Sequence, residues 1–200
     1  MKDTKEHILK VSFNLFMQKG YKGVTLKDIV ESTGMSKGAF YHYFSSKEEL
    51  FKEVIRLYFQ AGIDTFFDGM PRDNLRNFIN IYLQNLIDLL DNMKINFGFS
   101  NSQQGLAYYG MLFDIMRLFP EYDMKTNEHY NTQISIWEET IKNARKNGEI
   151  SSHMSDLQLA RLFVVINDGV VIKFITLGRT DDIAAEMFSL YNSLYSLIKT

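Results

Sequence analysis

Apolar side chains recur every three or four residues along most of the chain, a spacing that places them on one face of a helix. Leu75, Phe78, Ile79 and Tyr82, for example, begin a stripe of this kind. Glycine, proline or a capping residue interrupts the pattern at intervals. The pattern predicts an all-α fold, with helices at about residues 4–19, 26–32, 37–43, 49–67, 74–93, 111–119, 125–147, 156–177 and 180–198.

Near the N-terminus, two short helix patterns stand on either side of a glycine-containing turn at residues 33–35. Thr25 is suited to cap the first short helix and Ser36 the second, because a hydroxyl accepts a backbone hydrogen bond at a helix start. Ser46 and Glu49 have the spacing of a capping box for the longer helix that follows. This order of elements predicts a helix-turn-helix.

The same spacing divides the second short helix into a buried and an open side. We expect Met35, Phe40 and Phe44 to face the core. The open side then carries small, basic and aromatic residues, which suit a helix that enters a DNA groove. On this reasoning the side chains that contact DNA phosphates are those of Lys37, Tyr41, His42 and Lys47. The residues that would lie against base edges are Lys37, Gly38 and Ala39, and Ser36 stands at the start of this helix.

A break at Gly69 and Pro71 marks a change in organisation. We expect a helix-turn-helix DNA-binding domain at residues 1–48 and a helical effector-binding and dimerisation domain at residues 49–200. The helix at 49–67 would bridge the two. Residues 94–110 are rich in glycine and form either short helices or a loop, and such a segment is a candidate flap or entrance to a pocket.

Charge and composition narrow the function classes. Residues 1–60 hold 10 Lys and Arg and 7 Asp and Glu, whereas residues 61–200 hold 12 and 17, so a basic N-terminal part precedes an acidic remainder. That distribution concentrates phosphate binding in the N-terminal part. The chain has no cysteine, which fits a cytoplasmic protein, and no apolar stretch suited to a signal peptide or a membrane span.

The N-terminal third resembles the DNA-binding domain of the TetR family of transcriptional repressors. The residues that carry this resemblance are ILKVSFNLFMQKGY and VTLKDIVESTGMSKGAFYHYFSSKEEL. The resemblance implies about nine helices, a homodimer formed by the last two helices, and a small-molecule effector pocket in the C-terminal part. It also implies that Thr25 and Lys47 hold DNA phosphates, while Lys37, Gly38, Ala39, Tyr41 and His42 face the DNA.

Aromatic and methionine side chains concentrate in the C-terminal part, where they serve either as ordinary core or as the lining of a mostly apolar effector pocket. Asn167 and Asp168 interrupt an apolar helix, and they either bind a ligand or metal or satisfy neighbours at a dimer interface. The candidate ligand-binding residues are Tyr82, Phe97, Tyr108, Tyr109, Phe113, Met116, Trp137 and Asn167.

No arrangement of residues predicts catalysis or a cofactor, and the four histidines lack the spacing of a metal site. The sequence therefore predicts a non-enzymatic DNA-binding regulator, a repressor that a hydrophobic effector releases from a near-palindromic operator. The alternative is a helical ligand-binding or scaffolding protein that does not bind DNA. A small-molecule enzyme on an all-α body ranks below both.

Overall fold

The computed structural model describes the backbone of residues 2–60, 65–97 and 102–200. It describes the side chains of these residues except at positions 2, 3, 59, 60, 93, 94, 96, 97, 102, 121 and 123–126. Within the described residues the chain forms helices and a single isolated antiparallel bridge, between Ile150 and Lys199. The predicted all-α fold is confirmed. No helix in the described ranges is long and apolar enough to cross a membrane.

The helices divide into two compact units, which are described separately. Unit 1 comprises Met1–Thr65 and Leu106–Tyr122, and unit 2 comprises Phe66–Gly105 and Asp123–Thr200. Helix α7 (Ser102–Leu118) therefore begins in unit 2 and continues in unit 1.

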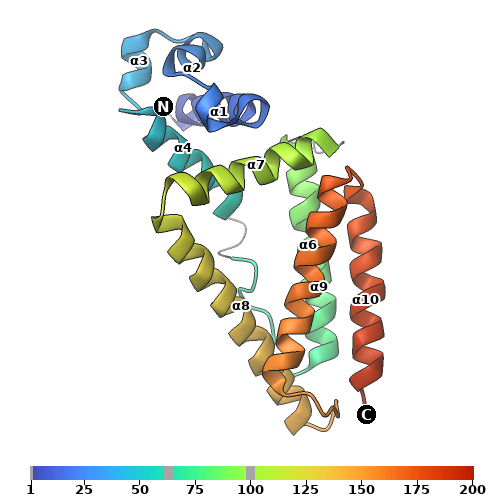
Figure 1. Ribbon diagram of the computed structural model, residues 1–200. Helices are drawn as coiled ribbons and strands as arrows, with labels where there is room; N and C mark the ends of the chain where they lie inside the picture. The colour runs from blue at the N-terminus through green and yellow to red at the C-terminus, as the bar shows by residue number, and fades with distance from the viewer. Residues whose placement is uncertain (1, 61–64, 98–101) are drawn as a thin grey trace. The chain divides into compact units, whose positions relative to one another are not determined.

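Unit 1 is built on α1 (Lys2–Gly23), which packs against α2 (Leu26–Thr33) and α4 (Lys47–Ile55), with α3 (Lys37–Tyr41) between the latter two in sequence (Figure 1). The backbone of α1 leaves the helical conformation at Gly20, whose φ of 67° is one that glycine adopts easily. This confirms the predicted stop after Lys19. Tyr21 then packs against Phe51, with ring centroids 4.6 Å apart.

The predicted helix at 49–67 is wrong in its second half. The α-helix ends at Ile55 and gives way to the π-helical turn η1 (Arg56–Gln60). Residues 61–64 lie outside the described residues, and residues 65–69 form turns. Phe66 packs against Tyr82 at a centroid distance of 5.0 Å.

Unit 2 contains α6 (Leu75–Phe97), most of α8 (Glu121–Lys146), α9 (Asp156–Thr176), the short η2 (Thr180–Asp182) and α10 (Ile183–Ile198). Helix α10 packs against α9 and α6, and Figure 1 shows α9 and α10 side by side. The apolar stripe predicted for the fifth helix is buried at Leu75, Phe78, Ile79, Tyr82, Leu86 and Leu90, whereas Leu89, also predicted for it, is half-buried.

Five aromatic side chains form the centre of unit 2, and we call them the aromatic cluster: Phe78, Tyr82, Trp137, Phe163 and Tyr191. Trp137 is fully buried and stacks on Phe163, with centroids 4.6 Å apart and an interplanar angle of 5°. Tyr82 meets Trp137 at 5.1 Å and Tyr191 at 5.6 Å. Aromatic rings bury large areas, so this cluster contributes much of the packing energy of unit 2.

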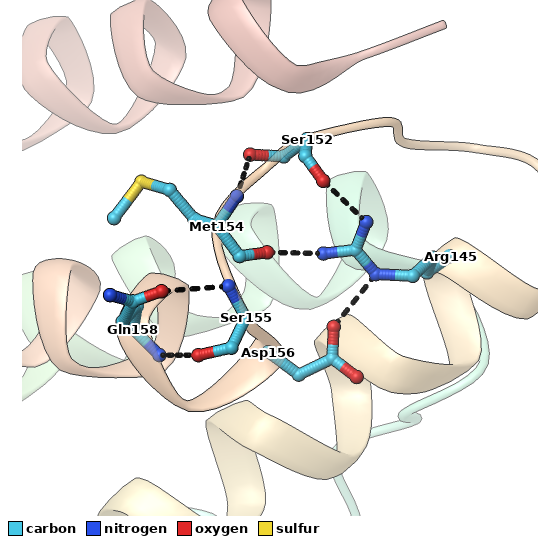
Figure 2. Close-up of polar contacts among 6 residues, drawn as sticks. All are labelled: Arg145, Ser152, Met154, Ser155, Asp156 and Gln158. Carbon is cyan, nitrogen blue, oxygen red and sulfur yellow. Dashed lines mark hydrogen bonds and ion pairs between the residues drawn. The ribbon is translucent and has the colours of Figure 1, made fainter.

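The connection between α8 and α9 is fixed by Arg145 (Figure 2). Its guanidinium donates to Asp156 Oδ1 at 2.8 Å and to the carbonyl oxygens of Ser152 and Met154 at 2.9 and 2.8 Å. Ser155 and Gln158 exchange the two hydrogen bonds of a capping box at the start of α9.

The question left open for residues 94–110 is answered where the structure describes them. Residues 94–97 close α6 and residues 102–110 open α7, so both parts are helical, while 98–101 lie outside the described residues. Gly105 explains how α7 approaches α9 within unit 2. A Cβ at this position would lie 2.0 Å from the carbonyl oxygen of Ile175, so any other residue would collide with the backbone.

Candidate nucleic-acid interface

The start of α2 is held by Thr25, as the sequence predicts. Its hydroxyl accepts from the backbone N–H of Asp28 at 3.1 Å, and the Asp28 carboxylate accepts from the Thr25 backbone N–H at 2.8 Å. The hydroxyl also donates to this carboxylate at 2.6 Å. These hydrogen bonds lower the pKa of Asp28, and the bond from the Thr25 side chain has the largest effect. The box keeps the Asp28 carboxylate ionised and fixes where α2 begins.

The turn between α2 and α3 passes through Gly34, whose φ of 68° caps α2 in the left-handed conformation. Ser36 then caps α3, and its hydroxyl accepts from the backbone N–H of Ala39 at 3.2 Å. Both features match the predicted helix-turn-helix. The predicted end of α3 at Tyr43 is wrong. The helix ends at Tyr41, because the chain must turn before Ser46 begins α4.

Two phenylalanines anchor α3 to unit 1. Phe40 is completely buried and Phe44 is 2% exposed, as predicted, while Met35 is half-buried. The five residues at or next to α3 that were expected to face DNA are all exposed. These residues are Lys37, Gly38, Ala39, Tyr41 and His42. A Cβ placed on Gly38 would meet no atom within 4 Å, which confirms that this part of the helix opens to solvent.

Ser46 caps α4 by accepting from the Glu49 backbone N–H at 3.0 Å. The capping box predicted for Ser46 and Glu49 also needs the Glu49 carboxylate to accept from the Ser46 backbone N–H, and this part of the prediction is wrong. The Glu49 carboxylate accepts instead from the hydroxyl and the backbone N–H of Ser45, at 2.6 and 2.8 Å. The Ser45 hydroxyl is the main cause of the lowered pKa of Glu49. Two consecutive serines offered equivalent donors, and the sequence does not distinguish them.

Lys47 lies at the start of α4, but its ammonium is turned toward the connection between α1 and α2. The Nζ donates to the carbonyl oxygens of Tyr21 and Val24, at 2.9 and 2.8 Å. It also lies 4.1 Å from the centroid of the Tyr21 ring. Burial lowers the pKa of Lys47. The residue thus joins two segments of unit 1, a role that the sequence did not indicate.

The eight candidate ligand-binding residues fall in both units. Phe113 and Met116 are 63% and 39% exposed on the part of α7 that belongs to unit 1, where Tyr108 and Tyr109 also lie. In unit 2, Tyr82 and Trp137 belong to the aromatic cluster and Asn167 lies on α9. Phe97 ends α6, and its side chain lies outside the described residues.

Unit 2 contains buried polar atoms that lack partners in the described part of the chain. These are the indole Nε1 of Trp137 and the amide Oδ1 of Asn167. Next to the cluster, the Tyr82 hydroxyl is hydrogen-bonded to Tyr191 and Gln133. Gln133 was missed in the sequence analysis, although it precedes Trp137 by one helical turn and therefore shares its face.

Among the residues that the structure describes, no group of three or more His, Asp or Glu side chains is arranged to hold a metal ion.

Comparison with known proteins finds relatives of the N-terminal segment. Residues 8–54 match the family model described as "Bacterial regulatory proteins, tetR family". The uncharacterized HTH-type transcriptional regulator YfiR of Bacillus subtilis is 34% identical over 94 residues, which are 44% of this chain and 46% of YfiR. The HTH-type transcriptional repressor NemR of Escherichia coli is 36% identical over 59 residues, 30% of each chain. The chain thus spans half or less of the length of these relatives.

Solved structures extend the likeness to the whole fold. A TetR transcription regulator from Haloarcula marismortui superposes with a TM-score of 0.69 and 15% identity, and covers 100% of both chains. Salmonella enterica GusR superposes with a TM-score of 0.62 and 20% identity, over 97% of this chain and 96% of its own. At these identities the likeness shows a shared fold.

Proposed function

The chain belongs to the TetR family of transcriptional regulators, and from this premise we propose that it is a repressor whose hold on DNA a small-molecule effector releases. Relatives that carry the word repressor in their names include NemR and the KstR2 protein of Mycolicibacterium smegmatis. Family members are regulators and not enzymes, in agreement with the prediction of no catalytic activity.

The observation that carries the DNA-binding proposal is the division of α3 into an anchored and an open face. Phe40 is fully buried, whereas the residues on either side of it, Ala39 and Tyr41, are exposed. Gly38 and Ala39 allow close approach to a duplex, because they present almost no side chain. Lys37 and the two ring-bearing residues Tyr41 and His42 then supply donors for phosphates and base edges.

Thr25 and Lys47 contribute to this surface differently from α3. Each uses its polar group within the protein: Thr25 in the box with Asp28, and Lys47 on two backbone carbonyls. An ammonium has three N–H donors, so one remains for a phosphate after these two bonds. We propose that both residues act chiefly by positioning α2 and α4 for DNA.

The homodimer is proposed to form through α9 and α10. Both helices carry large apolar side chains that the single chain leaves exposed, including Val165 and Phe188, each 58% exposed, and Ile172 at 43%. Apolar area of this kind is typical of subunit interfaces. The pairing would set two α3 helices about one DNA turn apart, roughly 34–36 Å.

Helix α7 offers a route for the effector signal, because it takes part in both units. In unit 2, Gly105 of α7 packs on the backbone of Ile175. In unit 1, Asp114 of the same helix accepts a hydrogen bond from the backbone N–H of Tyr21 at 3.2 Å. An effector that favours one position of α7 would therefore alter the connection that precedes α2.

Selection from random-sequence duplex DNA tests the proposed function. We expect the wild-type chain to enrich a near-palindromic sequence with half-sites one helical turn, or a multiple of it, apart. The Lys37→Ala/Tyr41→Ala double variant should enrich nothing under the same conditions. If the wild type also enriches no sequence, the chain is instead a helical ligand-binding or scaffolding protein.

A further inference from the structure

We propose that His42 is the base-reading side chain at the end of α3, and that it recognises a guanine in each half-site of the operator. The inference rests on the proposed function, because it takes α3 as the helix that enters the major groove. It adds which side chain selects the sequence and which base that side chain prefers.

Phe40 fixes the orientation of α3, because its buried ring marks the inner side of the helix. Successive residues of an α-helix are about 100° apart, so Gly38 and His42, two residues before and two after, each lie about 160° from Phe40. The backbone of His42 is still helical, with φ −67° and ψ −26°, so this spacing holds as far as His42. Gly38 and His42 therefore form the centre of the open face.

Of these two central residues, His42 is the one that carries a side chain. A Cβ on Gly38 would meet no atom within 4 Å, so this position leaves room for the approach of a duplex. His42 stands one helical turn further along and is exposed. Base-contacting positions of other recognition helices are spaced in the same way, three or four residues apart. His42 thus lies where a side chain can reach the floor of the groove.

Lys37 and Tyr41 lie on one flank of the open face. Both are on the same side of Phe40, about 60° and 100° around the helix. The Lys37 ammonium lies 5.9 Å from the centroid of the Tyr41 ring, at a distance where the ring attracts a cation. This contact holds the charge beside the groove wall, along which the phosphates run. Lys37 is therefore suited to a backbone contact, which positions α3 but does not read sequence.

The imidazole of His42 is available to DNA. In His7, the other histidine of unit 1, Nε2 donates to the carbonyl oxygen of Thr33 at 3.2 Å. The ring nitrogens of His42, by contrast, make no hydrogen bond with any described residue. Its ring packs edge-on against that of the half-buried Tyr43, with centroids 5.3 Å apart and an interplanar angle of 84°. Tyr43 thus orients the ring and leaves the nitrogens free.

Guanine is the base that matches an imidazole donor. A histidine ring carries at least one N–H in every tautomer and protonation state. In the major groove guanine presents two adjacent acceptors, N7 and O6, whereas adenine places an amino donor beside its N7 and cytosine presents a donor. An outward N–H of His42 is therefore accepted best by guanine, and N7 is the acceptor to which we assign the bond.

The first test changes the DNA and leaves the protein intact. Each guanine of the selected operator is replaced in turn, in both half-sites, by 7-deazaguanine, which lacks the N7 acceptor. We expect one replacement to weaken binding by the wild type about fivefold per half-site, as loss of one hydrogen bond predicts. The same replacement should change binding by His42→Ala less than twofold, because this variant has already lost the donor.

The second test changes the base preference. Glutamine pairs with N6 and N7 of adenine, so selection by His42→Gln should enrich adenine where the wild type enriches guanine. His153→Gln makes the same change at an exposed position between α8 and α9 and should keep guanine. Lys37→Ala should weaken binding to all sequences about equally and keep the preference. Thermal unfolding checks that every variant is folded.

Three results would overturn the inference: no 7-deazaguanine that weakens binding by the wild type, a loss that persists in His42→Ala, or an unchanged base preference in His42→Gln. Each of them leaves the proposed function intact, because the wild type still selects an operator. A wild type that selects no sequence would refute the proposed function, and this inference with it.

Discussion

Lys47 provides the sharpest test of how unit 1 holds its helix-turn-helix. The variant Lys47→Met keeps an unbranched stem of similar length and removes the ammonium group. It therefore abolishes the hydrogen bonds to the carbonyl oxygens of Tyr21 and Val24, at 2.9 and 2.8 Å, and the contact with the Tyr21 ring at 4.1 Å. The Tyr21 carbonyl lies in the last turn of α1, and the Val24 carbonyl lies in the connection to α2.

The size of the effect follows from two opposing contributions. A hydrogen bond from a charged donor contributes about 1.5–3 kcal/mol to the free energy of unfolding. Desolvation of the ammonium, which lowers the pKa of Lys47, offsets part of that gain. The side chain is also only half-buried, so solvent screens the charge. We expect Lys47→Met to lower the free energy of unfolding by about 1–2 kcal/mol.

Denaturant unfolding followed by circular dichroism measures this loss. Lys27→Met is the matched control, because Lys27 lies on α2 with 82% of its side chain exposed and forms a surface ion pair with Glu31. We expect the control to change the free energy of unfolding by less than about 0.5 kcal/mol. An unfolding midpoint for Lys47→Met equal to that of the wild type would refute the anchoring role.

The salt dependence of DNA binding separates anchoring from phosphate contact. If Lys47 acts by positioning α2 and α4, Lys47→Met weakens binding but leaves the slope of log affinity against log salt unchanged. Loss of a phosphate contact would instead make that slope shallower by about one unit. A shallower slope together with unchanged stability would assign Lys47 to the DNA backbone.

Three further predictions concern other parts of the chain. Arg145→Ala should lower the free energy of unfolding by about 2–3 kcal/mol, as measured by denaturant unfolding, because one guanidinium supplies three hydrogen bonds between α8 and α9. Val165→Glu/Phe188→Glu should give a folded monomer in light scattering, because both side chains are exposed apolar surface in the single chain. Hydrogen bonding to Arg56 lowers the pKa of Glu53 from 4.5 to about 2, so its stabilisation is fully present above pH 4.5 and disappears as the pH falls toward about 2. The difference in unfolding midpoint between wild type and Glu53→Gln should follow that course.

Each of these predictions has a control or a contradicting result. Arg179→Ala removes a surface ion pair, whose arginine side chain is 62% exposed, and should have little effect compared with Arg145→Ala. Val170 of α9 is only 6% exposed in the single chain, so a charge there should unfold the chain rather than separate a dimer. Unchanged dimers of the double glutamate variant would contradict the proposed interface. A constant difference for Glu53→Gln across the acid range would contradict the assigned pKa.

The local signals of the sequence were enough to predict most helix ends. Thr25, Ser36 and Ser155 each cap a helix where a hydroxyl precedes a helical pattern, and Gly34 and Gly148 adopt the positive φ expected at a helix end. These interactions span only a few residues. The sequence therefore contains all the information that determines them.

Predictions failed where distant residues decide the structure. The α-helix predicted at 49–67 ends at Ile55, and Phe66, placed in that helix by its pattern, packs on Tyr82 instead, a contact that no local pattern reveals. Helix α7 begins nine residues before Met111, the start of the helix predicted at 111–119, and its Gly105 fits closely against Ile175. The glycines of residues 94–110 left short helices and a loop both open in the sequence.

The same distinction applies to the candidate sites. The open face of α3 could be predicted, because its buried anchor Phe40 and its exposed neighbours alternate within a single turn. The partners of Lys47 lie 23 and 26 residues earlier and could not. The polar atoms beside the aromatic cluster depend on how α8 and α9 pack together, so the sequence named Trp137 and Asn167 but missed Gln133.

Fluorescence anisotropy with the selected DNA sequence, across a salt series, tests the central claim most directly. We expect Lys37→Ala/Tyr41→Ala to weaken binding by at least about tenfold and to make the salt slope shallower by about one unit. Lys142→Ala/Tyr130→Ala makes the same changes at exposed positions of α8 and should bind within about twofold of the wild type. Equal binding by the wild type and the α3 variant at every salt concentration would contradict the assignment of α3 as the DNA-reading helix.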